Sequence, residues 1–348
     1  MRIFHCDRCD HAVPFSAQRC AVCDASLGYV ADERTIHVLS DTPETAVFAL
    51  ADGRTVWRCL NAAWGCNWVV PAASDNPWCR SCQLTRGRPD EARHDAIEAW
   101  ITAEAAKRRL VHQLDELSLP VEARSAAAPD GLAFDLVYLP GEAQITGHLD
   151  GLVTLDLAEI DDRHREDLRK MLGEPFRTVI GHLRHEIGHH YWGRLVGQSN
   201  DVAGFRQLFG DETADYRGAI DQFYANADEA WDHRRFVSPY AAAHPFEDWA
   251  ETFAHYLHIM DAIDTATAYE LVPAEPPGAK GDASPHDWFE AMLNAWRPIN
   301  DAVNAVAESL GAAPLYPFDP VGIVIDKLAF VHQQVVAHTR RDRFYLTN

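Results

Sequence analysis

Apolar residues recur at intervals of three and four over several stretches of this chain, which is the spacing of amphipathic helices. Prolines mark their ends: Pro175 and Pro245 suit the first turn of a helix, and Pro120 stops one. Five helices are therefore expected, at about residues 96–117, 176–192, 245–258, 286–311 and 320–340.

Shorter apolar runs, bounded by turn residues, predict strands. The last run contains Asp150-Gly151, a pair that favours the tight turn of a β-hairpin. A few short strands among many helices predict an α+β fold, with a mostly helical body and a small β-sheet. The strands are expected at residues 35–39, 46–50, 132–139 and 145–157.

One pentapeptide of the second helix, His185-Glu186-Ile187-Gly188-His189, matches the HExxH pattern of zinc-dependent peptidases. Residues four apart lie one turn up the same helix face, so both imidazoles can reach one metal ion while Glu186 lies beside it. The plainer alternative is a helix whose histidines are solvated or bonded to one another. Because the flanking apolar residues give this helix a side that faces the core, we expect His185 and His189 to bind metal.

A catalytic zinc takes three protein ligands and keeps a fourth position open, so a third ligand is expected downstream. In the third helix Glu247, Glu251 and His255 fall on one stripe, although an ordinary solvent-exposed face would look the same. We predict that Glu247 binds the metal and that Glu251 accepts the N–H of a ligating histidine, with Glu251 and His255 as alternative ligands. The Glu-x-x-x-Glu spacing resembles the gluzincin pattern. The residues from Glu247 to Ala254 look like the third-ligand helix of ImmA/IrrE-type metallopeptidases.

Such a centre would hydrolyse peptide bonds in a peptide or protein substrate, with zinc polarising the scissile carbonyl and Glu186 transferring the proton of water to the leaving amine. The oxyanion that forms during hydrolysis needs a hydrogen-bond donor, and we expect Tyr240 as the first choice and His233 as the second. The plainer alternative for Tyr240 is a place in the protein core. Two other functions stay open: a metal-dependent hydrolase of another substrate, and a non-catalytic binding or regulatory protein on a zincin scaffold. Glu186 favours an enzyme, because an idle site does not need that carboxylate.

All eight cysteines precede residue 83 and form two sets of four. Each set can enclose one zinc ion tetrahedrally with no open position, which stabilises segments too short to bury a core. Disulfides or free thiols are the alternative, but disulfides need export, and the first ten residues contain no apolar signal segment. We therefore predict two structural zinc ions beside the catalytic one, held by Cys6, Cys9, Cys20 and Cys23 and by Cys59, Cys66, Cys79 and Cys82.

The second cysteine set also resembles a Ran-binding-protein-type zinc finger, in the Trp57-Arg58-Cys59 opening and in Asn67 after the second cysteine. The gap from Cys59 to Cys66 is longer than in that family. The resemblance implies single-stranded RNA or ubiquitin as a ligand, so a protein or RNA partner at this end is an open possibility. The nearby tryptophans Trp57, Trp64, Trp68 and Trp78 would suit stacking on bases, but the plainer role for them is the buried core of a small zinc site.

Charge limits the partners of the rest of the chain. The sequence contains 31 Lys plus Arg against 52 Asp plus Glu, a net charge of −21, and residues 1–90 carry 9 basic and 10 acidic side chains. Nearly all of the negative excess therefore lies after residue 90, where it disfavours nucleic acid. The sequence contains no run of eighteen apolar residues, so it offers no candidate for a membrane span. We expect a cytoplasmic protein.

Nearly the full length of the chain resembles a bacterial family of zinc-ribbon, zinc-binding metallopeptidases, which are zincin-like proteins with the HExxH motif. The resemblance rests on the cysteine sets, on residues 185–192, on Leu-Phe-Gly-Asp-Glu at 208–212 and on His-Pro-Phe-Glu-Asp-Trp-Ala-Glu at 244–251. It implies a zinc-dependent peptidase. We expect a zinc ribbon at 1–30, a second four-cysteine zinc module with short strands at 31–88 and a zincin-like catalytic domain at 89–348. Three acidic residues are expected either to cap helices or to line the cleft: Asp211, Glu212 and Asp215.

Overall fold

The computed structural model describes residues 3–138, 147–160, 178–198, 201–226, 231–272 and 284–346. The chain divides into two compact units, the first of residues 1–146 and 151–160 and the second of residues 147–150 and 161–348. The functional division expected at residue 88 stays a prediction, and the helix that follows it is part of the first compact unit. Helices predominate over small sheets, which confirms the predicted α+β class.

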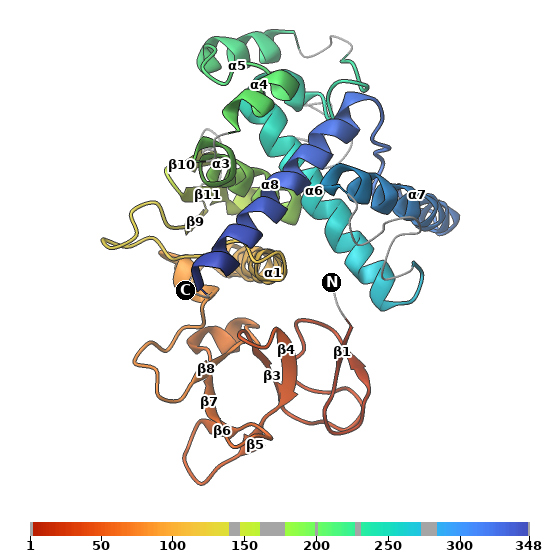
Figure 1. The fold of residues 1–348 in the computed structure, drawn as a ribbon. Coiled ribbons are helices and arrows are strands. Elements are labelled where there is room, and N and C mark those ends of the chain that lie inside the picture. The colour runs from red at the N-terminus through yellow and green to blue at the C-terminus, as the bar shows by residue number, and fades with distance from the viewer. Residues whose placement is uncertain are drawn as a thin grey trace. The chain divides into compact units, whose positions relative to one another are not determined.

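The N-terminal ninety residues form short antiparallel strands (Figure 1). The strands expected at 35–39 and 46–50 are β4 (Thr35–Val38) and β6 (Val47–Ala49). Alternating apolar residues of these strands and their connections, among them Val30, Leu39 and Val56, make a small buried core. The pairs are β1 (Phe4–His5) with β2 (Ala12–Val13) and β3 (Leu27–Val30) with β4 (Thr35–Val38), followed by a four-stranded sheet of β5 (Ser40–Asp41), β6 (Val47–Ala49), β7 (Thr55–Arg58) and β8 (Val69–Pro71).

Helix α1 (His94–Glu116) packs into the same unit as the cysteine-rich strands. The ring of Tyr29, fully buried, lies 4.6 Å from that of Trp68 and 5.2 Å from that of Phe15. Its hydroxyl is hydrogen-bonded to His112 Nδ1 of α1 over 2.7 Å. Burying several aromatic rings at one junction stabilises these segments as one body. The helix expected at 96–117 is confirmed, and it ends before Pro120 as predicted.

Two parallel strands complete the first unit, β9 (Ala133–Val137) and β11 (Leu152–Asp156). They confirm the strands expected at 132–139 and 145–157, although residues 139, 145 and 146 lie outside the described part of the chain. Asp150 and Gly151 follow β10 (Gly147–Leu149) and have φ of 48° and 83°. Positive φ at both positions is what the predicted Asp-Gly turn requires.

The second unit is helical. Helix α6 is central in it and contacts α3, α7 and α8 (Figure 1). At its contact with α3 the backbones come close, because a Cβ on Gly188 would lie 2.9 Å from Ala250 Cα. Trp249 Nε1 donates to the Gly188 carbonyl over 2.8 Å. The helices are α3 (Val179–Trp192), α4 (Val202–Phe209), α5 (Tyr216–Ala225), α6 (Pro245–Ala268), α7 (Pro285–Ser309) and α8 (Ile323–Leu346).

A buried ion pair joins α6 to α8. Lys327 Nζ lies 2.5 Å from Asp248 Oδ2, and both side chains are almost fully buried. Burying a charge costs free energy unless it is paired, and here each buried charge has the other as its partner. Among the described helices, none combines the length and apolar character needed to cross a membrane.

Candidate metal centre

The HExxH residues lie on α3, as predicted. Thr178 caps this helix by accepting a hydrogen bond from Gly181 N, and Leu183, Ile187 and Tyr191 are buried on its core side. The helix start expected after Pro175 falls in residues 171–177, which lie outside the described part of the chain. Because His185 and His189 are one turn apart on the same face, their Nε2 atoms are 3.3 Å from one another.

The third predicted ligand comes from the first turn of α6. His244 caps this helix by accepting from Phe246 N, and Pro245 occupies its first turn, where its missing N–H is not needed. Glu247 Oε2 lies 3.1 Å from His185 Nε2 and 3.5 Å from His189 Nε2. Glu247 is 1% exposed and His255 is 5% exposed, so the stripe on α6 is not an ordinary solvent-exposed face.

These three residues fit a zinc ion. Ligand atoms bound tetrahedrally at the usual zinc distances lie about 3.3 Å from one another, which matches the three separations between the imidazole nitrogens and the carboxylate oxygen. Glu247 Oε2 is buried without a hydrogen-bond partner in the described chain. Burial by itself would raise the pKa of Glu247, but the two imidazoles hold that pKa well below its usual value. The carboxylate is therefore ionised and available to a cation.

Glu251 lies behind the centre. Its Oε1 is 2.6 Å from His185 Nδ1, the nitrogen that faces away from Glu247. Burial opposes ionisation of Glu251, yet the bond to His185 lowers its pKa to about 2. His255, the other alternative ligand, is instead hydrogen-bonded through Nδ1 to the hydroxyl of Tyr316 over 2.6 Å. Glu251 therefore lies within hydrogen-bond distance of His185, and its role as the acceptor of a histidine N–H stays a prediction.

Glu186, the predicted base, is 5% exposed on the same helix as the two histidines. Its Oε1 lies 3.3 Å from His182 Nε2, one turn earlier. Burial acts to raise the pKa of Glu186, but His182 and the two motif histidines lower it overall. The side chain is therefore a carboxylate at neutral pH, the form that can accept a proton.

Two tyrosines border the centre, and the sequence pointed to one of them. The ring of Tyr240, the predicted oxyanion donor, lies 5.9 Å from the ring of His185. Tyr216 was not predicted, although its hydroxyl donates to Glu247 Oε1 over 2.6 Å. Burial and the nearby Glu247 raise the pKa of both phenols, so both hydroxyls keep their protons. His233, the second choice as donor, is exposed and its ring lies near that of Trp231.

A further histidine near the centre was also missed. His148 of β10 stacks with His189 at a ring separation of 6.2 Å.

The acidic residues expected either to cap helices or to line the cleft serve local structure. Asp215 caps α5 by accepting from Gly218 N, Asp211 accepts from Thr213 N, and Glu212 pairs with Arg206 over 2.6 Å.

The eight cysteines form the two predicted clusters, and none is in a disulfide. In the first set Cys6 and Cys23 Sγ are 3.6 Å apart, and so are Cys9 and Cys20 Sγ. In the second set Cys66 Sγ lies 3.7 Å from Cys79 Sγ and 3.8 Å from Cys82 Sγ. Thiolates bound tetrahedrally to zinc lie about 3.8 Å apart, whereas a disulfide requires about 2 Å. Both sets fit zinc.

Charged residues of α1 surround the second cysteine cluster. Glu104 Oε2 lies 3.9 Å from Cys82 Sγ, and Glu104 Oε1 lies 2.7 Å from Nζ of the fully buried Lys107. Arg108 is also buried beside Glu104. Lys107 and Arg108 therefore offset the charge of the buried Glu104 carboxylate, which lies beside the cluster. Arg58, which precedes the first cysteine of this cluster, donates to the Leu27 carbonyl and to Ser26 Oγ.

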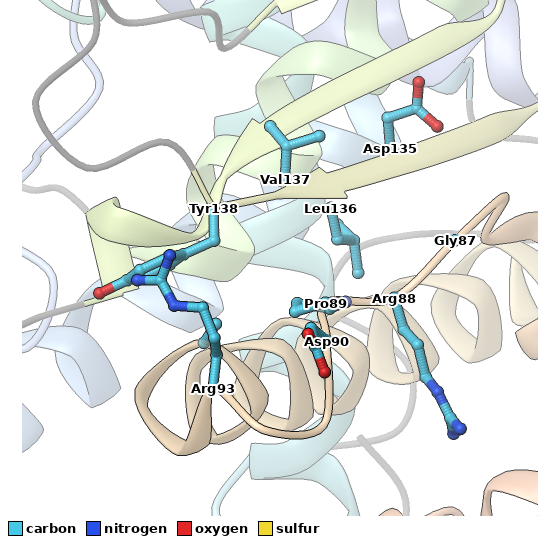
Figure 2. Close-up of a pocket in the computed structure, with 10 residues that line it drawn as sticks. Gly87, Arg88, Pro89, Asp90, Arg93, Asp135, Leu136, Val137 and Tyr138 are labelled. Atoms are coloured by element: carbon cyan, nitrogen blue, oxygen red, sulfur yellow. The ribbon is translucent and has the colours of Figure 1, made fainter.

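A separate hollow of about 280 Å³ opens in the first unit between the segment before α1 and strand β9 (Figure 2). The Arg93 guanidinium lies over the Tyr138 ring at 4.6 Å, and the Tyr138 hydroxyl donates to Asp95. Arg86 and Asp135 form an ion pair nearby. None of the residues predicted to bind metal or to act in catalysis lines this hollow.

Comparison with known proteins identifies the family of the chain. A family model described as "Putative zinc-binding metallo-peptidase" matches residues 96–334, and a model of a zinc-ribbon domain matches residues 3–93. Uncharacterized proteins of Mycobacterium bovis and Mycobacterium tuberculosis are 41% identical to the chain over 352 aligned residues, which cover 98% of this chain and 99% of theirs. No solved structure matches. The family resemblance seen in the sequence is confirmed: the chain belongs to this family of zinc-binding metallopeptidases and carries a zinc ribbon at its N-terminus.

Proposed function

We propose that this protein is a zinc-dependent peptidase that hydrolyses peptide bonds of peptides or proteins. The observation that carries the proposal is the meeting of His185, His189 and Glu247 around one point, next to the ionised and buried Glu186. Three protein ligands leave one position open, which distinguishes a catalytic zinc site from the closed cysteine sites.

Each residue of the centre has one task. His185, His189 and Glu247 would hold a zinc ion, which would supply a Lewis acid able to polarise a carbonyl and to lower the pKa of a bound water towards neutrality. Glu186 accepts the proton of the attacking water and delivers it to the leaving amine. Tyr240, protonated and next to His185, donates a hydrogen bond to the developing oxyanion.

Two contacts hold the ligands in place. When His185 donates Nδ1–H to Glu251, the lone pair of Nε2 is left for the metal, and the carboxylate makes the imidazole a stronger ligand. Tyr216 donates to Oε1 of Glu247, so that Oε2 faces the histidines. Glu251 and Tyr216 therefore act on the ligands and not on the substrate.

We also propose three zinc ions per chain, one catalytic and two structural. The cysteine sites use all four thiolates and leave no open position, so they are structural. The alternative to a peptidase is a non-catalytic protein that uses the same scaffold to bind a partner, and it predicts full zinc content without hydrolysis.

Hydrolysis of a mixed peptide library tests the proposal. The zinc-loaded protein, its Glu186→Gln variant and the matched control Glu290→Gln, at an exposed position of α7, are each incubated with tryptic peptides of a bacterial proteome. Mass spectrometry should find new cleavages with wild type and control and none with Glu186→Gln, at equal zinc content. If the zinc-loaded protein leaves the peptides uncut, the result would support the binding-protein alternative. If Glu186→Gln cleaves as well as wild type, Glu186 is not the general base.

A further inference from the structure

Helix α5 has an apolar face that the protein core does not bury. Tyr216, Ala219, Ile220 and Phe223 recur at helical spacing and share this face, yet none of the ten residues of α5 is buried. Tyr216 is 45% exposed, and Tyr224, which follows Phe223 in the chain, is 49% exposed. Large apolar side chains gathered on an exposed surface are typical of binding sites.

This face is continuous with the metal centre. Tyr216, the first residue of α5, donates its hydroxyl to Glu247. About two turns further along, the rings of Phe223 and Tyr224 lie 5.5 Å and 6.4 Å from the ring of Tyr240. Tyr240 in turn lies against His185. A row of aromatic rings therefore leads from the metal ligands to the exposed end of α5.

We propose that Phe223, Tyr224 and Tyr240 form a wall of the substrate cleft that holds a large apolar or aromatic side chain close to the scissile bond. This inference rests on the proposed peptidase function and adds a preference among substrates. Aromatic rings pack favourably against apolar and aromatic side chains, beyond the effect of burial alone. A cationic side chain fits less well, because an ammonium group loses hydration when it is buried beside these rings.

Peptide binding to the zinc-loaded Glu186→Gln variant tests the wall without turnover. Calorimetry compares three blocked pentapeptides that are alanine except for a central Phe, Gly or Lys. The Phe peptide should bind about tenfold or more tightly than the Gly peptide. Phe223→Ala should remove most of that difference, and Phe223→Leu should remove part of it. Arg217→Ala, at an exposed polar position of the same helix, should leave it unchanged.

Three results would overturn the inference: equal binding of the Phe and Gly peptides, tightest binding of the Lys peptide, or an unchanged preference in folded Phe223→Ala and Phe223→Leu. Circular dichroism establishes that each variant is folded. Because this readout is binding, a failure of hydrolysis in the library experiment would count against the proposed function, whereas a missing preference here counts against the aromatic wall alone.

Discussion

The contact between Glu251 and His185 makes a quantitative prediction about zinc affinity. Glu251→Gln keeps the size of the side chain and an oxygen that can accept from His185 Nδ1, but it removes the negative charge 2.6 Å from that nitrogen. Loss of such a partner behind a ligating histidine costs about 10- to 100-fold in metal affinity. We therefore expect the catalytic zinc to bind more weakly by about 1.4–2.7 kcal/mol.

Competition with a chromophoric chelator at pH 7 measures this affinity, because the open site should release its zinc before the closed cysteine sites do. Glu290→Gln is the matched control at an exposed position. Glu247→Gln should lose more affinity than Glu251→Gln, since it changes the ligand itself. A Glu251→Gln affinity within twofold of wild type would refute the assigned role, and so would a loss as large as that of Glu247→Gln.

Three further predictions concern the rest of the molecule. Asp248→Asn leaves the buried Lys327 without its carboxylate and should lower the free energy of unfolding by about 3–5 kcal/mol in a urea titration, whereas a loss below about 1 kcal/mol would argue against the pair. Burial lowers the pKa of His332 from 6.5 to about 4, so this group contributes stability above pH 6.5 that is lost as pH falls through 4. Between pH 7 and pH 4 wild type should lose about 3 kcal/mol more than His332→Phe, and parallel stability curves would contradict this. Cys66→Ser, at a fully buried cysteine of the second cluster, should release one zinc ion and destabilise the first unit. Cys9→Ser, at an exposed cysteine of the first cluster, should leave the second cluster filled. Metal analysis that finds both clusters emptied by either change would show that the two clusters are not independent.

Periodicity predicted the long helices because their apolar faces are set by local spacing. It predicted fewer than half of the described strands and missed most of the two- to four-residue strands among the cysteines, which are too short to show a period. It did not predict α5, whose apolar face is short and not buried in the core. The capping residue Asp215 was noticed, but a single cap does not establish a helix.

The sequence predicted the metal ligands more fully than it predicted the groups that hold these ligands in place. Spacing placed Glu247 and Glu251 on one stripe of α6, but it could not say which carboxylate faces which nitrogen of His185. That choice depends on how α6 is rotated against α3, where the close approach of Gly188 and Ala250 fixes the contact. Tyr216 lies 31 residues before Glu247 in sequence, so only tertiary packing brings its hydroxyl to the carboxylate.

The central claim is that two imidazoles of α3 and one carboxylate of α6 bind the same zinc ion. Crystals of the zinc-loaded protein, measured on both sides of the zinc absorption edge, test it most directly. The account predicts three anomalous peaks per chain, one of them about 2.0–2.2 Å from His185 Nε2, His189 Nε2 and Glu247 Oε2. Filled cysteine sites with no peak among those three atoms would contradict it.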